Sequence, residues 1–179
     1  AIGGLLALAR QLPAIIAEQR EPRWAPLLQT GRPRDLDGQL AVIVGWGPIG
    51  QRIGALAQAL GLELAVVRHS DTAAPEATTT VRYSDIGSLL PRTDWLVLCC
   101  PLSDETRGLI DRNALALLPS PAHIINVARG DVIDEAAIVA APANGALAGP
   151  APDVLALGPR GPGPPAGRGR AGGGRGGWG

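Results

Sequence analysis

Leu40-Ala-Val-Ile-Val44 runs directly into Gly45-Trp46-Gly47-Pro48-Ile49-Gly50, and this succession carries the clearest structural signal in the chain. The first five residues form a short, continuous apolar run rich in β-branched side chains, which is typical of a strand buried on both faces. The six that follow match Gly-x-Gly-x-x-Gly, and a helix is predicted from Ile49 to Leu60, ended by Gly61. A strand, a glycine loop and a helix are therefore expected in direct succession.

The glycine loop has the spacing of a dinucleotide-phosphate site. Gly45 permits a tight turn, Gly47 lets the backbone approach a pyrophosphate, and Gly50 allows close packing of the helix. The helix N-terminus offers unpaired N–H groups and the positive end of its dipole, and Pro48 near its start removes no needed donor. We therefore predict a dinucleotide site here, in preference to a purely structural turn, with Trp46 as a space-filling side chain beside the cofactor.

Further apolar runs and capping residues follow along the chain. The expected strands are 62–67, 95–100 and 124–127, and the expected helix starts are Ser84-Asp85, Asp104-Glu105, Asp111 and Asp134. Strands that alternate with helices at this spacing indicate βαβ units with right-handed crossovers. The expected fold is therefore α/β, a Rossmann-type doubly wound parallel sheet.

The two ends of the chain differ from this central part. Residues 1–31 predict a kinked leading helix, with Gly3, Gly4 and Pro13 as weak points, and a connector. Residues 32–158 form the expected dinucleotide-binding domain. Residues 159–179 are rich in Gly, Pro and Arg and contain almost nothing that could offset the entropy cost of ordering, so we expect a disordered C-terminal tail.

Composition narrows the possible functions. The 179 residues are 46% hydrophobic and carry a formal net charge of zero, so they can build a core but provide no global field for nucleic acid or a membrane surface. No apolar run approaches the roughly 20 residues that span a bilayer. The neighbours Cys99 and Cys100 cannot easily pair with each other or alone hold a metal. We expect inert thiols, no metal site and a reducing, cytoplasmic setting.

Cofactor preference is predicted from the end of the second strand, which reads Val67-Arg68-His69-Ser70-Asp71. In this fold an acidic residue about 20 positions after the glycine loop binds the ribose hydroxyls of NAD, whereas a cation accommodates the 2′-phosphate of NADP. Arg68, His69 and Ser70 can donate hydrogen bonds to a phosphate, so they favour NADP. In the alternative, these residues are solvated and Asp71 binds the ribose of NAD.

Two longer segments make the chain resemble a known family. Trp95-Leu-Val-Leu-Cys-Cys-Pro-Leu-Ser-Asp-Glu-Thr-Arg-Gly-Leu-Ile110 and Ile124-Ile-Asn-Val-Ala-Arg-Gly-Asp-Val-Ile-Asp-Glu135, after the glycine loop, resemble the D-isomer-specific 2-hydroxyacid dehydrogenases. The resemblance covers roughly residues 1–155, with its three motifs in the right order. The chain is most similar to glyoxylate/hydroxypyruvate reductase-like members, because those that prefer NADPH tend to carry a basic pair where Arg68-His69 stands.

The resemblance implies an oxidoreductase that transfers hydride between a nicotinamide cofactor and a small 2-oxo or 2-hydroxy acid. It also implies a homodimer, and a nucleotide domain inserted into a substrate domain, of which this chain would be a fragment. Arg129 is the implied catalytic residue, because the family's arginine holds the substrate carboxylate and polarises its carbonyl. The implied cofactor contacts are Pro48, Ile49, Arg68, Cys100 beside Pro101, Val127, Ala128 and Asp153, which join Gly45, Gly47, Gly50, His69 and Ser70.

The rest of the family's catalytic set does not carry over. The family places a Glu five residues after the aspartate and a proton-donating His downstream, whereas this chain has Gly158 at the first position and only His69 and His123. We therefore expect this chain to be nearly inactive, and hypothesise a frameshift or an assembly error in the source DNA after about Gly145. The alternatives are a non-catalytic nucleotide-binding module that acts as a cofactor-sensitive interaction domain, and an RNA-binding Arg/Gly-rich tail in which Trp178 stacks on bases.

Overall fold

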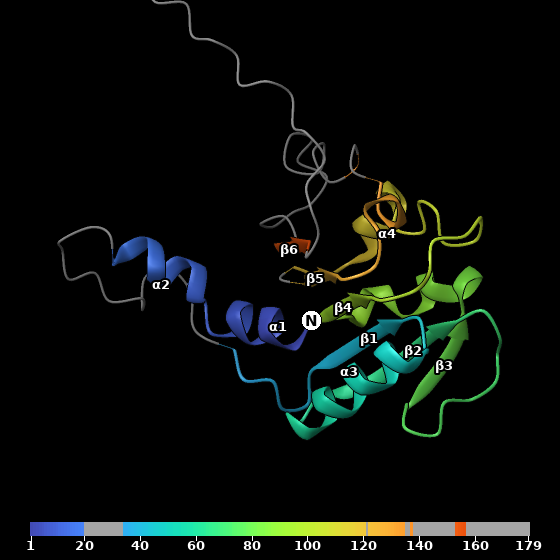
Figure 1. The fold of residues 1–179 in the computed structure, drawn as a ribbon, viewed down its shortest axis with the longest axis horizontal. Coiled ribbons are helices and arrows are strands. Elements are labelled where there is room, and N and C mark those ends of the chain that lie inside the picture. Colours follow the sequence, from blue (N-terminus) through green and yellow to red (C-terminus); the bar gives the residue numbers. More distant parts are fainter. Residues whose placement is uncertain (20–33, 121, 135–136, 138–152, 157–179) are drawn as a thin grey trace, which may run out of the picture.

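The computed structural model describes residues 1–19, 34–120, 122–134, 137 and 153–156. Its centre is a six-stranded sheet in the order β3-β2-β1-β4-β5-β6, with all neighbouring strands parallel (Figure 1). The strands are β1 (Leu40–Val44), β2 (Glu63–Arg68), β3 (Thr79–Arg82), β4 (Trp95–Leu98), β5 (His123–Asn126) and β6 (Asp153–Ala156). The order runs outward from β1 in both directions, which confirms the doubly wound Rossmann-type fold.

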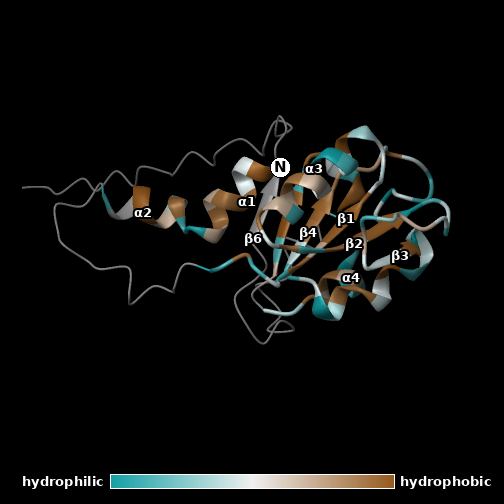
Figure 2. Ribbon diagram, turned by 90° about the horizontal axis from the view of Figure 1, so that it is seen from below, coloured by the Kyte–Doolittle hydropathy of each residue, from teal (hydrophilic) through white to brown (hydrophobic). Residues whose placement is uncertain are grey.

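Helices cover both faces of the sheet. The α-helices are α1 (Ile2–Ala9), α2 (Leu12–Glu18), α3 (Pro48–Ala59) and α4 (Arg112–Leu117), and the 3-10 helices are η2 (Tyr83–Ser88), η3 (Leu90–Arg92) and η4 (Gly130–Val132). One apolar cluster joins α1 and α3 to the sheet, and a second joins η2, η3 and α4 to the other face. Figure 2 shows the apolar strands between α3 on one side and α4 on the other. The core is thus buried between two layers, as a parallel sheet requires.

The leading helix is broken, as predicted, and the structure locates the break. The chain leaves the helix at Arg10 and Gln11, where Gln11 has a φ of 55°. Pro13 has no N–H with which to bond the Ala9 carbonyl, and the backbone N–H of Arg34 donates to that oxygen instead, at 3.0 Å. Gly3 and Gly4 lie inside α1, so the break does not fall at these two expected weak points.

Two of the predicted helix starts are wrong, and the other two have the predicted capping hydrogen bond. Residues 83–88 form a 3-10 helix without a side-chain cap, so Ser84-Asp85 does not begin an α-helix. Asp104-Glu105 lies in a run of turns. The Asp111 carboxylate, by contrast, accepts the Ala114 N–H at 2.8 Å, and the Asp134 carboxylate accepts the Ala137 N–H at 3.3 Å. The predicted tail, the connector and Gly158 lie outside the described residues.

Strand β3 was not predicted, and the third predicted strand ends earlier than expected. Residues 79–82 are half-exposed on the edge of the sheet, so they lack the continuous apolar run of a central strand. Strand β4 ends at Leu98, so Cys99 and Cys100 belong to the loop that follows it. This loop and the glycine loop of β1 lie side by side at the carboxyl edge of the sheet, because β1 and β4 are paired in register.

Candidate functional site

The three glycines of the loop after β1 occupy different surroundings. Gly45 has a φ of +102°, and a Cβ there would lie 2.7 Å from the Cα of Cys100. A Cβ on Gly50 would overlap the carbonyl oxygen of Gly45. Gly47, the N-cap of α3, has nothing within 4 Å of its Cβ position. Gly45 and Gly50 therefore allow the loop to pack, whereas Gly47 leaves open space at the N-terminus of a helix, where an anion binds well.

A cavity of about 550 Å³ opens at the carboxyl ends of β1, β4 and β5. It is lined by Gly47, Pro48, Ile49, Cys99, Cys100, Pro101, Leu102, Val127, Ala128 and Arg129. Three segments far apart in the sequence therefore meet around one space, and most of the predicted cofactor contacts lie there with the predicted catalytic arginine. In open α/β sheets this edge, at the point where the strand order reverses, is where ligands bind.

Asn126 fixes the loop that carries Arg129. Its side chain is buried at the end of β5, where Oδ1 accepts the N–H of Ala128 at 2.9 Å and Nδ2 donates to the carbonyl of Arg129 at 3.1 Å. Two hydrogen bonds thus hold the backbone of the loop that places the exposed Arg129 at the rim of the cavity. The sequence analysis missed Asn126, although a polar residue closing an apolar strand is a signal for such a turn.

Thr106 fixes the facing loop. Its side chain is fully buried, with Oγ1 donating to the carbonyl of Pro101 at 2.7 Å and accepting the N–H of Ser103 at 2.8 Å. These bonds hold Pro101 and Leu102 against the cavity as an apolar wall. Thr106 was also missed, because nothing local in the sequence marks a threonine as buried.

The two cysteines are thiols whose pKa values are raised above the ordinary value. The Cys99 thiol donates to the carbonyl of Gly45 at 3.1 Å, and burial raises its pKa to about 12, with a further contribution from Cys100. Burial also raises the pKa of Cys100. Both are free cysteines, and both line the cavity. Their environment stabilises the neutral thiol, which agrees with the expectation that they are inert.

Slow alkylation of both cysteines is therefore expected. At pH 8 a thiol with the ordinary pKa of 9.0 is about one-tenth ionised, whereas a pKa of about 12 lowers the thiolate fraction of Cys99 roughly 1,000-fold. Mass spectrometry after iodoacetamide treatment should find both thiols unmodified under conditions that label the urea-unfolded chain completely. Rapid labelling of Cys99 in the folded chain, at a rate that levels off below pH 9, would contradict this environment.

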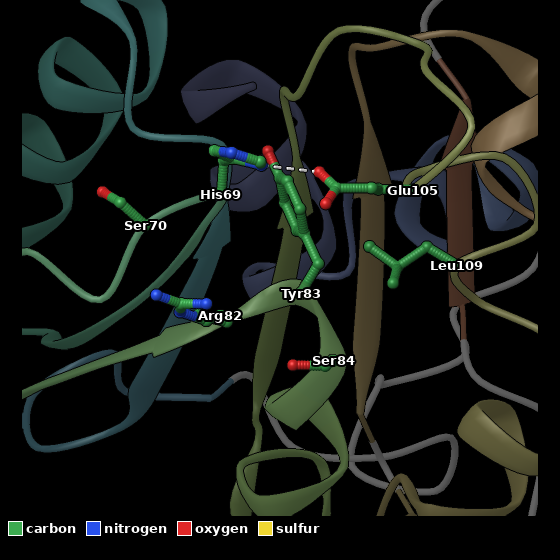
Figure 3. A pocket seen from close by; sticks show the side chains of 7 residues that line it. All are labelled: His69, Ser70, Arg82, Tyr83, Ser84, Glu105 and Leu109. Atoms are coloured by element: carbon green, nitrogen blue, oxygen red, sulfur yellow. Dashed lines mark hydrogen bonds and ion pairs between the residues drawn. The ribbon is translucent and has the colours of Figure 1, made fainter.

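A second cavity, of about 430 Å³, lies at the carboxyl ends of β2 and β3 (Figure 3). It is lined by His69, Ser70, Arg82, Tyr83, Ser84, Glu105 and Leu109. Nδ1 of His69 is 2.7 Å from the Glu105 carboxylate, and the Arg82 guanidinium is 3.2 Å from that of Asp71. Burial, with smaller effects of Cys100, Cys99 and Glu105, raises the pKa of Tyr83 to about 12. The predicted His69 and Ser70 are thus grouped with Arg82, Tyr83 and Leu109, for which the sequence predicted no role, and with Ser84 and Glu105, which it placed at helix starts.

Three residues lie apart from these cavities. Asp153 begins β6 in register with His123, which places its backbone at the amino edge of the sheet, away from the other predicted contacts. His123 is buried and stacks on Trp95 with ring centroids 4.4 Å apart, in keeping with a structural role. The Trp46 ring packs on α3, where a Cβ on Gly54 would lie 2.6 Å from Cη2. The expectation that Trp46 lies beside the cofactor is therefore corrected.

Two other kinds of site are absent from the described residues. There, no group of three or more His, Cys, Asp or Glu side chains is arranged to hold a metal ion. No helix in the same part of the chain has the length and apolar character needed to cross a membrane.

Comparison with known proteins then identifies the family. The model of the D-isomer specific 2-hydroxyacid dehydrogenase NAD binding domain matches residues 2–165. The chain belongs to this family. It is 32% identical over 155 residues to a glyoxylate/hydroxypyruvate reductase of Arabidopsis thaliana, covering 87% of this chain and 47% of that protein. It is 33% identical over 138 residues to a hydroxypyruvate reductase of Thermotoga maritima, covering 77% and 44%.

Solved structures agree with this assignment. A D-isomer specific 2-hydroxyacid dehydrogenase of Xanthobacter autotrophicus Py2, crystallised with NADPH and MES, superposes with a TM-score of 0.71 at 30% identity, over 90% of this chain and 65% of that one. A protein of Thermus thermophilus superposes with a TM-score of 0.73 at 30% identity, over 92% and 50%. The chain spans about half the length of the curated relatives described above.

Proposed function

We propose that this domain binds NADPH along the carboxyl edge of its sheet and serves, in the whole protein, the reduction of a small 2-oxo acid of the glyoxylate or hydroxypyruvate type. The observation that carries the proposal is the cavity that joins Gly47, at the open N-terminus of α3, to Arg129 on the loop after β5. Reductases of these two acids among the relatives support the substrate class. A bound nicotinamide would supply the hydride.

Different residues around the cavity bind different parts of the cofactor and the substrate. The N-terminus of α3 receives the pyrophosphate, because its N–H groups and helix dipole favour an anion. The apolar side chains of Pro101, Leu102 and Val127 exclude water from the nicotinamide end. Arg129, held by Asn126, binds the acid's carboxylate in a bidentate manner and draws electron density from the neighbouring carbonyl, so that carbonyl accepts hydride more readily.

NADPH is proposed in preference to NADH on the charges at the end of β2. Arg68 occupies the strand end itself, and within the described residues it makes no ion pair with a carboxylate. Asp71, the alternative ribose ligand, is engaged by Arg82. A cation in the position that selects the cofactor, without an ion-pair partner of its own among the described residues, favours the 2′-phosphate.

The purified chain is expected to bind cofactor without ordinary turnover. No described histidine lies at the cavity with Arg129, because His123 is at the amino edge of the sheet and His69 lines the second cavity. General acid catalysis typically raises a rate about 10²–10⁴-fold. Reduction of glyoxylate or hydroxypyruvate by this chain should therefore be at least about 100-fold slower than by a whole relative. NADPH oxidation measured with both acids tests this, and an ordinary enzymatic rate would contradict it.

A second candidate function is a non-catalytic nucleotide-binding module, which Gly158 in place of the family's Glu favours. A chimera distinguishes the two candidates. Residues 34–134 would replace the matching segment of the Thermotoga maritima hydroxypyruvate reductase, so that the rest of a complete reductase surrounds this chain's cavity. Turnover by the folded chimera supports the reductase function, whereas tight NADPH binding without turnover supports the module.

A further inference from the structure

The ends of β2 and β3 place two arginines side by side. Arg68 and Arg82 are partners in the parallel register of these strands, and each is the last residue of its strand. Paired residues on neighbouring parallel strands leave the same face of a sheet about 4.8 Å apart at the backbone. Two adjacent guanidinium groups repel each other, so this arrangement favours an anion that lies between them.

The carboxylate that accompanies this pair is held weakly. Asp71 contacts Arg82 through a single 3.2 Å approach, and their side chains are 77% and 54% exposed. Ion pairs this exposed contribute little to stability, because water competes for both partners. A phosphate, which offers more acceptor oxygens and more charge, binds a guanidinium more strongly than a solvated carboxylate does. Asp71 is therefore replaceable.

Arg82 also faces the second cavity. It lines the second cavity together with His69 and Ser70, which are the residues next to Arg68 in sequence. Figure 3 shows Arg82 and Ser70 on the side of this cavity opposite Glu105 and Leu109. The guanidinium of Arg82, the hydroxyl of Ser70 and the imidazole of His69 thus line one cavity. Arg68 is the register partner of Arg82 at the same strand ends, where the adenosine half of a dinucleotide is bound in this fold.

We infer that Arg82 is a second ligand of the 2′-phosphate of NADPH and that Asp71 is the counter-ion displaced when the phosphate binds. This inference rests on the proposed function and adds a cofactor-selecting residue on β3 to the one on β2. Arg82 thereby raises the affinity for NADPH and not the affinity for NADH, because only the phosphorylated cofactor presents a charge to it.

The test compares Arg82→Gln with the unaltered chain by isothermal titration calorimetry, using NADPH and NADH. Loss of one charge-assisted contact is expected to weaken NADPH binding about tenfold, while NADH binding stays within twofold. The matched control is Arg92→Gln, which alters an exposed arginine of η3 before the amino end of β4. It should change neither the NADPH affinity nor the NADH affinity. An unchanged ratio of the two affinities in folded Arg82→Gln would overturn the inference.

A second variant covers the case in which Arg82→Gln fails to fold. Asp71→Asn removes the competing carboxylate and should strengthen NADPH binding severalfold without affecting NADH. Unchanged NADPH binding by Asp71→Asn would contradict the displacement of Asp71 by the 2′-phosphate. Weaker NADH binding would identify Asp71 as a ribose ligand and would overturn the inference. If the unaltered chain binds neither dinucleotide, the proposed function fails together with this inference. If it binds both and only the Arg82 ratio is unchanged, the inference alone fails.

Discussion

Gly50→Ala is expected to lower the free energy of unfolding by about 3 kcal/mol, a large share of the about 5–15 kcal/mol that stabilises a typical domain. The added methyl group would overlap the Gly45 carbonyl oxygen and crowd the Cys99 sulfur, 3.2 Å from the Cβ position. Neither α3 nor the glycine loop can move away, because both pack on buried strands. Urea unfolding followed by circular dichroism measures the change.

The packing of the loop and the helix propensity of alanine predict opposite changes in stability for Gly50→Ala, so the measurement distinguishes them. Gly50 lies in the first turn of α3, and helix propensity alone would make alanine more stable there by up to about 1 kcal/mol. Gly47→Ala is the matched control, since nothing lies within 4 Å of its Cβ position. It should unfold at nearly the original urea concentration yet bind NADPH at least tenfold more weakly, because its methyl group occupies the approach of the pyrophosphate. Equal stability of the two variants would contradict the described loop packing.

Arg68→Asp is expected to reverse the cofactor preference. The carboxylate would accept hydrogen bonds from the ribose hydroxyls of NADH and would repel the 2′-phosphate of NADPH. Loss of a charge-assisted contact together with this repulsion should weaken NADPH binding about 100-fold, while NADH binding strengthens severalfold. Calorimetric titration with both dinucleotides measures the two changes.

The control for this variant is Arg92→Asp, which makes the same change of charge at the amino edge of the sheet. It should leave the preference for NADPH as it was, because long-range charge effects are screened by salt. If Arg68→Asp lowered both affinities equally, Arg68 would act on the fold or on the adenosine moiety in general. If it left both unchanged, the end of β2 would not select the cofactor.

The central fold could be predicted from the sequence because its signals are local. Strands β1, β2, β4 and β5 are buried on both faces, and each contains a continuous apolar run. Strand β3 was missed because an edge strand needs no such run. Asp104 and Glu105 were misassigned because carboxylates that could cap a helix are equally common in an exposed turn, where Glu105 pairs with His69.

The site could be predicted only as far as its motif extends. Gly47 and Arg129 belong to segments with a recognisable spacing, and the structure brings them to one cavity. Asn126 and Thr106 act through bonds to backbone atoms of loops, and the sequence does not specify these partners. Arg82 could not be predicted as a cofactor ligand, because it lies beside Arg68 only through the register of β3 against β2 in the folded sheet.

Parallel calorimetric titrations of the purified chain with NADPH and NADH test most directly whether the carboxyl edge of this sheet binds a nicotinamide dinucleotide. Calorimetry is preferable to tryptophan emission, because Trp46 packs against α3 and does not line the cavity. We predict one binding site with NADPH bound at least tenfold more tightly than NADH, because a single charge-assisted contact to the 2′-phosphate already provides about that ratio. Tighter binding of NADH would contradict the role of Arg68, and the absence of binding by either cofactor would contradict the proposed function as a whole.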